Sequence, residues 1–107
     1  GGEPRLIGVP ITFPSPVHLK TDTAVTFQYT LSRDMNIEIS LFDVSGQMVK
    51  KLSFAQGAEG GAAGVNKVRW DLMTDQGQRS ASGICIFTLV NRETGKLLGK
   101  GKFTALP

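Results

Sequence analysis

The alternation of apolar and polar residues constrains the fold of this chain more than any other feature of its sequence. In Val25–Leu31, four apolar side chains alternate with three polar ones, a period of two that is typical of a β-strand with one buried face. Related patterns recur in residues 37–44, 48–54, 66–72 and 97–106. No segment shows the period of an amphipathic helix. The sequence therefore predicts an all-β protein.

Clusters of Gly, Ser, Asn and Asp separate the predicted strands at short intervals. Residues 84–90 are apolar on both faces, which predicts a central strand that is covered from two sides. Residues 3–13 include Pro10 and are expected to form an N-terminal edge strand, where a missing N–H is tolerated. The glycine-rich segment Gly57–Gly64 predicts a mobile loop. About seven strands in this order predict an antiparallel β-sandwich of the Ig-like or fibronectin-III-like kind.

The length of 107 residues suits one domain, so residues 1–107 are expected to form a single Ig-like β-sandwich. The chain opens Gly1-Gly2 without an initiator Met, which is typical of the remnant of a cleaved tag and predicts a domain cut from a longer protein. No run approaches the ~20 apolar residues of a membrane helix, so direct membrane insertion is not expected. The isolated domain is expected to be monomeric.

The chain has a formal net charge of +3, and the excess lies at its C-terminal end. Lys96, Lys100 and Lys102 fall in or just before the last predicted strand. Lysines along a terminal strand protect an edge from aggregation more often than they bind a polyanion. Because no aromatic residues are interleaved with them as a stacking platform, we favour a solvated edge over nucleic-acid binding.

The residue types that catalysis needs are scarce. One His and one Cys cannot build a typical zinc site. His18 has no nucleophile motif around it and is expected at the surface. Cys85 lies between Ile84 and Ile86, which predicts a small buried hydrophobe rather than a reactive thiol. The sequence therefore predicts a non-enzymatic protein without a cofactor.

Asp71 and Asp75 leave two interpretations open. Two carboxylates four residues apart are compatible with part of a calcium site, which needs about six to eight oxygen ligands. The segment Asp75-Gln76-Gly77 is also typical of a turn, which is the interpretation that we favour. Whether a calcium ion binds near Asp71 and Asp75 is not decided by these residues.

Trp70 has the inward register of residues 66–72, which predicts a core side chain rather than a sugar-stacking platform. The alternative function is a carbohydrate-binding module accessory to an enzyme. That function would require Trp70, Tyr29 or Phe54 to lie on one open face.

Several short motifs occur in a fixed order along the chain. The proline pair Pro14-Ser15-Pro16 precedes Phe42-Asp43-Val44-Ser45-Gly46, which is followed by Val68-Arg69-Trp70-Asp71 and by Ala81-Ser82-Gly83. From Phe13 onward this set resembles the Ig-like domain of flagellar hook-capping proteins and the related C-terminal sorting domains of type IX secretion cargo.

Those families typically carry a Tyr-Asp-x-x-Gly turn, a Trp-Asp pair and an Ala-Ser-Gly entry to the next strand. Here Phe42 stands for the usual Tyr, and Leu72 stands where a Gly is often found. The resemblance implies that the matched residues are structural: a hairpin turn, a filler between the sheets and a strand entry. These residues are Asp43, Gly46, Trp70, Asp71 and Gly83.

The resemblance implies a non-catalytic module of a larger bacterial protein that is secreted, periplasmic or at the cell surface. Such a module would be a structural spacer, an attachment domain or a secretion-sorting domain. Its partners would be the rest of the parent polypeptide and secretion or surface-assembly proteins. For the sorting role, the last strand, with Lys96, Lys100, Lys102 and Phe103, is the expected recognition surface, because an edge strand can bind through its main chain.

Overall fold

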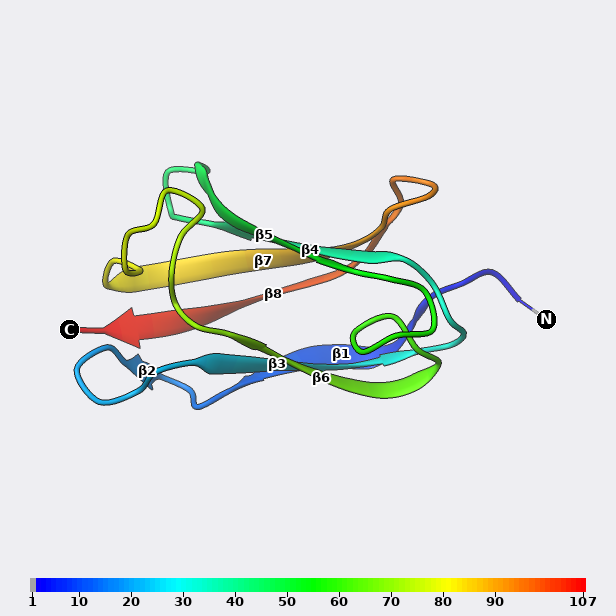
Figure 1. Ribbon diagram of the computed structural model, residues 1–107, viewed down its shortest axis with the longest axis horizontal. Coiled ribbons are helices and arrows are strands. Elements are labelled where there is room, and N and C mark those ends of the chain that lie inside the picture. Colours follow the sequence, from blue (N-terminus) through cyan, green and yellow to red (C-terminus); the bar gives the residue numbers. More distant parts are fainter. Residues whose placement is uncertain (1) are drawn as a thin grey trace.

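The computed structural model describes residues 2–107 and shows two β-sheets packed face to face, with no helix in that range (Figure 1). Gly1, the first residue of the expected tag remnant, lies outside the described residues. The strands are β1 (Leu6–Phe13), β2 (Val17–His18), β3 (Val25–Leu31), β4 (Ile37–Phe42), β5 (Met48–Phe54), β6 (Gly64–Trp70), β7 (Gly83–Asn91) and β8 (Leu97–Leu106). The predicted sandwich is therefore confirmed, and the eighth strand is the two-residue β2.

The two sheets are unequal. A three-stranded sheet has the order β1-β3-β6, and a five-stranded sheet has the order β2-β8-β7-β4-β5. Every strand pair is antiparallel except the short pair of β2 with β8, which is parallel. The chain passes from the first sheet to the second through the proline segment between β1 and β2. No helix in the described part of the chain could span a membrane.

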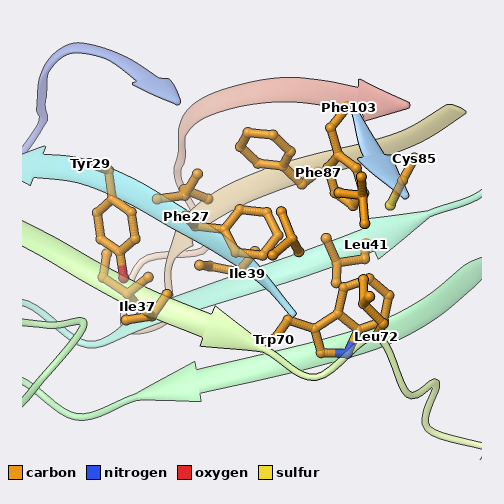
Figure 2. Close-up of a cluster of buried hydrophobic side chains, with 14 of the residues drawn as sticks. Phe27, Tyr29, Ile37, Ile39, Leu41, Trp70, Leu72, Cys85, Phe87 and Phe103 are labelled. Atoms are coloured by element: carbon orange, nitrogen blue, oxygen red, sulfur yellow. The ribbon is translucent and has the colours of Figure 1, made fainter. Parts of the chain in front are cut away.

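Strand β3 has the bounds that the alternation predicts, and its apolar side chains are buried against the second sheet. Phe27 of β3 packs edge to face against Phe87 of β7, with ring centroids 5.1 Å apart, and it meets Phe103 of β8 at 6.1 Å. Edge-to-face contacts of this kind add about 0.5–1.5 kcal/mol to the burial of the rings. Figure 2 shows these rings between the sheets, with Trp70 at one end of the cluster and Tyr29 at the other. The three rings Phe27, Phe87 and Phe103 thus join β3 to the central strands of the opposite sheet.

Strand β7 differs from its prediction on one face. It is central in its sheet, between β8 and β4, but Ile84 and Ile86 are 43% and 38% exposed. The two-sided covering expected for residues 84–90 was therefore wrong, since no layer lies over the outer face of the five-stranded sheet. β-branched residues also favour exposed strand positions, so apolar character on both faces did not require burial on both.

The glycine-rich loop also differs from its prediction, because it is held by hydrogen bonds. Gly60 and Gly61 are buried, and the Tyr29 hydroxyl donates to the Gly60 carbonyl at 2.7 Å. The Asn66 side chain accepts from the Gly60 and Ala62 amides and donates to the Ala62 carbonyl. A Cβ at Gly60 would collide with the Phe54 ring. The glycines thus serve close packing over the end of the core, whereas composition alone predicted mobility.

Candidate interaction site

The turn between β4 and β5 is built around one carboxylate. Asp43 Oδ1 accepts hydrogen bonds from the Ser45 hydroxyl at 2.6 Å, the Ser45 amide at 2.9 Å and the Gln47 amide at 3.0 Å. These bonds, the one from the Ser45 hydroxyl first, hold the pKa of Asp43 below its usual value. Gly46 has a φ of 87°, a conformation that glycine adopts without strain. Both residues act within the hairpin turn.

The other motif residues also have local structural roles. They are Trp70, Asp71 and Gly83. Trp70 is 1% exposed, and its indole N–H donates to the Met73 carbonyl at 2.8 Å. Asp71 Oδ1 accepts from the Met73 amide at 3.0 Å. Gly83 begins β7 with a φ of 127°. The buried register predicted for Trp70 is confirmed, and its ring is closed to ligands.

The single His and the single Cys are placed differently in the fold. His18 is exposed, and its Nδ1 lies 3.8 Å from Asp22 Oδ2. Cys85 is buried, and this burial raises the pKa of its thiol to about 11. A thiol that stays protonated at neutral pH is a poor nucleophile. Both placements agree with the surface histidine and the buried cysteine that the sequence predicts.

Asp71 and Asp75 bind different groups. Whereas Asp71 closes its own turn, the Asp75 carboxylate lies 3.1 Å from Lys50 Nζ and accepts from the Lys51 amide at 3.0 Å. Within residues 2–107, no three His, Cys, Asp or Glu side chains are grouped closely enough to hold a metal ion. The carboxylate of Asp75 thus binds two neighbouring residues at the edge of β5.

The last strand presents lysines but not the expected aromatic. Lys100 and Lys102 are exposed on the outer face, and Lys96 pairs with Glu3 at 2.6 Å. Phe103 is 2% exposed and packs on Phe27 in the core. The assignment of Phe103 to a recognition surface was therefore wrong, because the register of β8 against β7 places it opposite Cys85 on the inner face.

The aromatics that the carbohydrate-binding alternative needs do not share an open face. Tyr29 and Trp70 are buried, and Phe54 packs against the core beside the glycine-rich loop. The sequence pattern failed to mark a different exposed set, which lies on β1. Its members are Ile7, Val9, Ile11 and Phe13.

A groove of about 280 Å³ lies between the β4–β5 turn and the segment that leads into β7. Its lining mixes polar side chains such as Gln47 and Gln78 with apolar ones such as Phe42. Its two charged lining residues, Asp43 and Arg79, are held by local hydrogen bonds; Arg79 donates to two backbone carbonyls at 2.6 and 2.8 Å. The groove thus offers surface for contact and no free acid–base pair for chemistry.

Three sheet edges are obstructed in different ways. Strand β1 carries Pro10 and a register irregularity between Ile7 and Ile11. The edge of β5 is occupied by Asp75, whose amide donates to the Val49 carbonyl at 3.0 Å. The edge of β8 is paired with β2 at one end, and Leu6 and Pro10 of β1 lie against Gly99 near the other. Edges closed in this way resist pairing with another chain.

No protein-family model matches the chain, and neither does the sequence of any curated protein. Solved structures do resemble it. Dimeric latent PorU from Porphyromonas gingivalis matches 94% of this chain with a TM-score of 0.71 at 19% sequence identity. PorZ, an essential surface component of the type-IX secretion system of the same organism, matches 92% with a TM-score of 0.61 at 15% identity.

An immunoglobulin-like protein from Pseudomonas aeruginosa matches 97% of this chain and 97% of its own length, with a TM-score of 0.59 at 15% identity. The chain spans only about a tenth of PorU and of PorZ, at 10% and 11% of their lengths. At these identities the likenesses show the fold, which is an Ig-like β-sandwich.

Proposed function

We propose that the chain is a non-catalytic Ig-like module of a larger bacterial protein that is secreted or displayed at the cell surface. In this role the module is a spacer, an attachment domain or a secretion-sorting domain, and it works through strand edges and exposed faces. Its partners are the rest of the parent polypeptide and secretion or surface-assembly proteins. The proposal places the module outside the cytoplasm.

The observation that carries the proposal is that the side chains best suited to catalysis or ligand binding are taken up by contacts within the fold. Asp43, Asp71 and Asp75 bind backbone amides, Cys85 is buried with a raised pKa, and Trp70 is closed off in the core. These groups support the sandwich and leave no assembled reaction centre among them. Strand edges, turns, lysines and several apolar side chains are exposed, and such groups can form a binding surface.

The comparisons support the setting of the proposal. In two of the similar structures, the matched region is a small part of a much longer chain, as expected for a module. One of these is described as a surface component of a secretion system. The motif order from the proline pair to Ala81-Ser82-Gly83 supports the same setting through its resemblance to hook-capping and sorting domains.

The test is made in the bacterium, with the full parent protein. One strain lacks residues 3–107, and a second carries an unrelated Ig-like sandwich of similar length in their place. We expect the deletion to misplace the parent protein while its activity per purified molecule is unchanged. Restoration by the unrelated sandwich identifies a spacer, and failure to restore identifies attachment or sorting. A deleted parent that is correctly placed but inactive when purified contradicts the proposal.

A further inference from the structure

Strand β6 has a free edge along the three-stranded sheet, since β3 is its only strand partner among residues 2–107. The register of β6 against β3 is continuous from Gly64 to Trp70, without the irregularities found in β1 or β4. The strand contains no proline. Within residues 2–107, none of the backbone hydrogen bonds outside the sheets involves its residues. The edge of β6 is thus regular and open, whereas those of β1, β5 and β8 are obstructed.

The main-chain groups at this edge can be identified. The Ser32 amide, just after β3, donates to the Arg5 carbonyl, just before β1. Because the direction of the main-chain groups alternates along a strand, the even-numbered residues of β3 form hydrogen bonds with β1 and its odd-numbered residues form them with β6. The partners of those odd residues are the even residues of β6, among them Asn66 and Val68. Asn66 and Val68 are 6% and 1% exposed, backbone included, which agrees with this assignment.

The N–H and C=O groups that point away from β3 therefore belong to Val65, Lys67 and Arg69. Their side chains are exposed on the outer face of the same sheet. A strand added here would pair with all three residues.

The inner side of such a strand would also find a surface. Strand β1 lies against β8, and β3 lies against β7. The strand orders of the two sheets therefore place β6 toward β4, and the three-stranded sheet has no further strand to place toward β5. The inward side chain Leu52 of β5 is accordingly only partly buried, whereas Phe54 is already covered by Gly60 of the glycine-rich loop. A fourth strand beside β6 would cover Leu52 with an inward side chain of its own, which favours an apolar residue there.

The positive charges on β6 favour some incoming strands over others. Lys67 and Arg69 are exposed and form no ion pair with a carboxylate in the described part of the chain. A second copy of β6 in antiparallel pairing would oppose these cations to each other, and like charges on facing strands are destabilising. An incoming strand with carboxylates on its outer face would be stabilised instead.

We propose that the free edge of β6 binds an extended segment of another protein, in which acidic residues facing Lys67 and Arg69 alternate with apolar residues that point inward, toward Leu52. Main-chain pairing supplies affinity, and the alternation supplies specificity. This inference deepens the proposed attachment role and rests on it. It moves the docking strand from β8, which the sequence favours, to β6.

The test uses the chain and a synthetic peptide, acetyl-Thr-Val-Glu-Val-Glu-Val-Thr-amide, observed by amide NMR. We expect hydrogen exchange at the amides of Val65, Lys67 and Arg69 to be rapid in the free chain and to slow at least about tenfold with the peptide. The same peptide with Lys in place of Glu should not bind. The double variant K67E/R69E should weaken binding about tenfold, whereas K100E/K102E, a matched charge reversal away from this edge, should not.

A third variant, Lys67→Pro, removes a free-edge N–H without touching the bonds to β3, and it should abolish pairing while the fold is kept. Protection of amides on β8 or in the groove, equal binding by K67E/R69E, or no binding at millimolar peptide would overturn the inference. Protection of the β6 amides that grows with chain concentration alone would identify a second copy as the occupant and also overturn it. Misplacement of the parent on deletion of residues 3–107 is independent of these results, so the two proposals fail separately.

Discussion

At the scale of single residues, burial in the sandwich keeps two ionisable side chains, Tyr29 and Cys85, protonated. Burial raises the pKa of the Tyr29 hydroxyl above its usual value and raises that of the Cys85 thiol to about 11. Both groups are neutral when protonated, so burial favours the protonated form. Tyr29 uses its proton to bind the Gly60 carbonyl. Cys85 lies opposite Phe103 in the register of β7 and β8, in the core on which the sandwich depends.

The first prediction concerns alkaline pH. Between the ordinary thiol pKa of 9.0 and the folded value of about 11, the folded state holds more protons at Cys85 than the unfolded state does. The free energy of unfolding therefore falls as pH rises through this window. Urea unfolding followed by Trp70 fluorescence at several pH values measures the fall. In Cys85→Ala the fall should be smaller, and parallel curves for the two proteins would contradict the assignment.

The second prediction concerns the hydroxyl of Tyr29. Tyr29→Phe removes the donor from a buried hydrogen bond of 2.7 Å and leaves the Gly60 carbonyl without that partner. We expect a loss of about 1–2 kcal/mol in the free energy of unfolding, measured in urea. Gln28→Ala, on the outward face of the same strand, is the control and should change stability by less than about 0.5 kcal/mol. Equal stabilities of Tyr29→Phe and the wild type would show that the loop does not depend on this bond.

At the scale of elements, the edges of β1, β5 and β8 are kept from pairing with another chain, and the edge of β5 shows how. Asp75 closes the edge of β5 in two ways, since its amide donates to the Val49 carbonyl and its carboxylate accepts from the Lys51 amide. A loop residue thus takes the place of a neighbouring strand. The ion pair with Lys50 is partly exposed and adds at most about 1 kcal/mol. The backbone contacts of Asp75 are therefore its main contribution.

The third prediction separates these contributions. Asp75→Ala removes both the ion pair and the acceptor for the Lys51 amide, and Lys50→Met removes only the ion pair. We expect Asp75→Ala to lower stability by about 1 kcal/mol and to promote self-association, because the Lys51 amide at this edge is then free to pair with another copy although the bond to the Val49 carbonyl remains. Lys50→Met should stay monomeric. Sedimentation and urea unfolding of both variants provide the measurement, and aggregation of Lys50→Met alone would refute the explanation.

The strands were predictable from the sequence to the extent that one face of each is buried. The alternation in β3 fixed its bounds because every second side chain enters the core. It failed for the outer face of β7, since Ile84 and Ile86 are apolar without being covered. It also failed for Phe103, because the face on which a side chain lies depends on register against a distant strand. The open edge of β6 was equally hidden, since an edge is defined by the absence of a neighbour in space.

At the scale of the whole molecule, β8 belongs to the core as much as to the surface. It pairs with β7 along most of its length and with β2 near its end, and it buries Phe103 and Ala105 between the sheets. Strand β2 holds Val17, which is fully buried, and in the described part of the chain it pairs with β8 alone. A sandwich without β8 would lose its closure on the side where β1 meets β8.

The fourth prediction follows for any truncation used to test export. Deletion of Leu97–Pro107 should abolish cooperative unfolding, because it removes two core side chains and exposes the whole edge of β7. The double substitution K100A/K102A removes the exposed charges of β8 and should leave the unfolding midpoint nearly unchanged. Near-UV circular dichroism with urea titration distinguishes the two proteins. A folded, cooperative truncation would mean that β8 is dispensable. Loss of export in a truncated parent could then be attributed to a recognition surface rather than to misfolding.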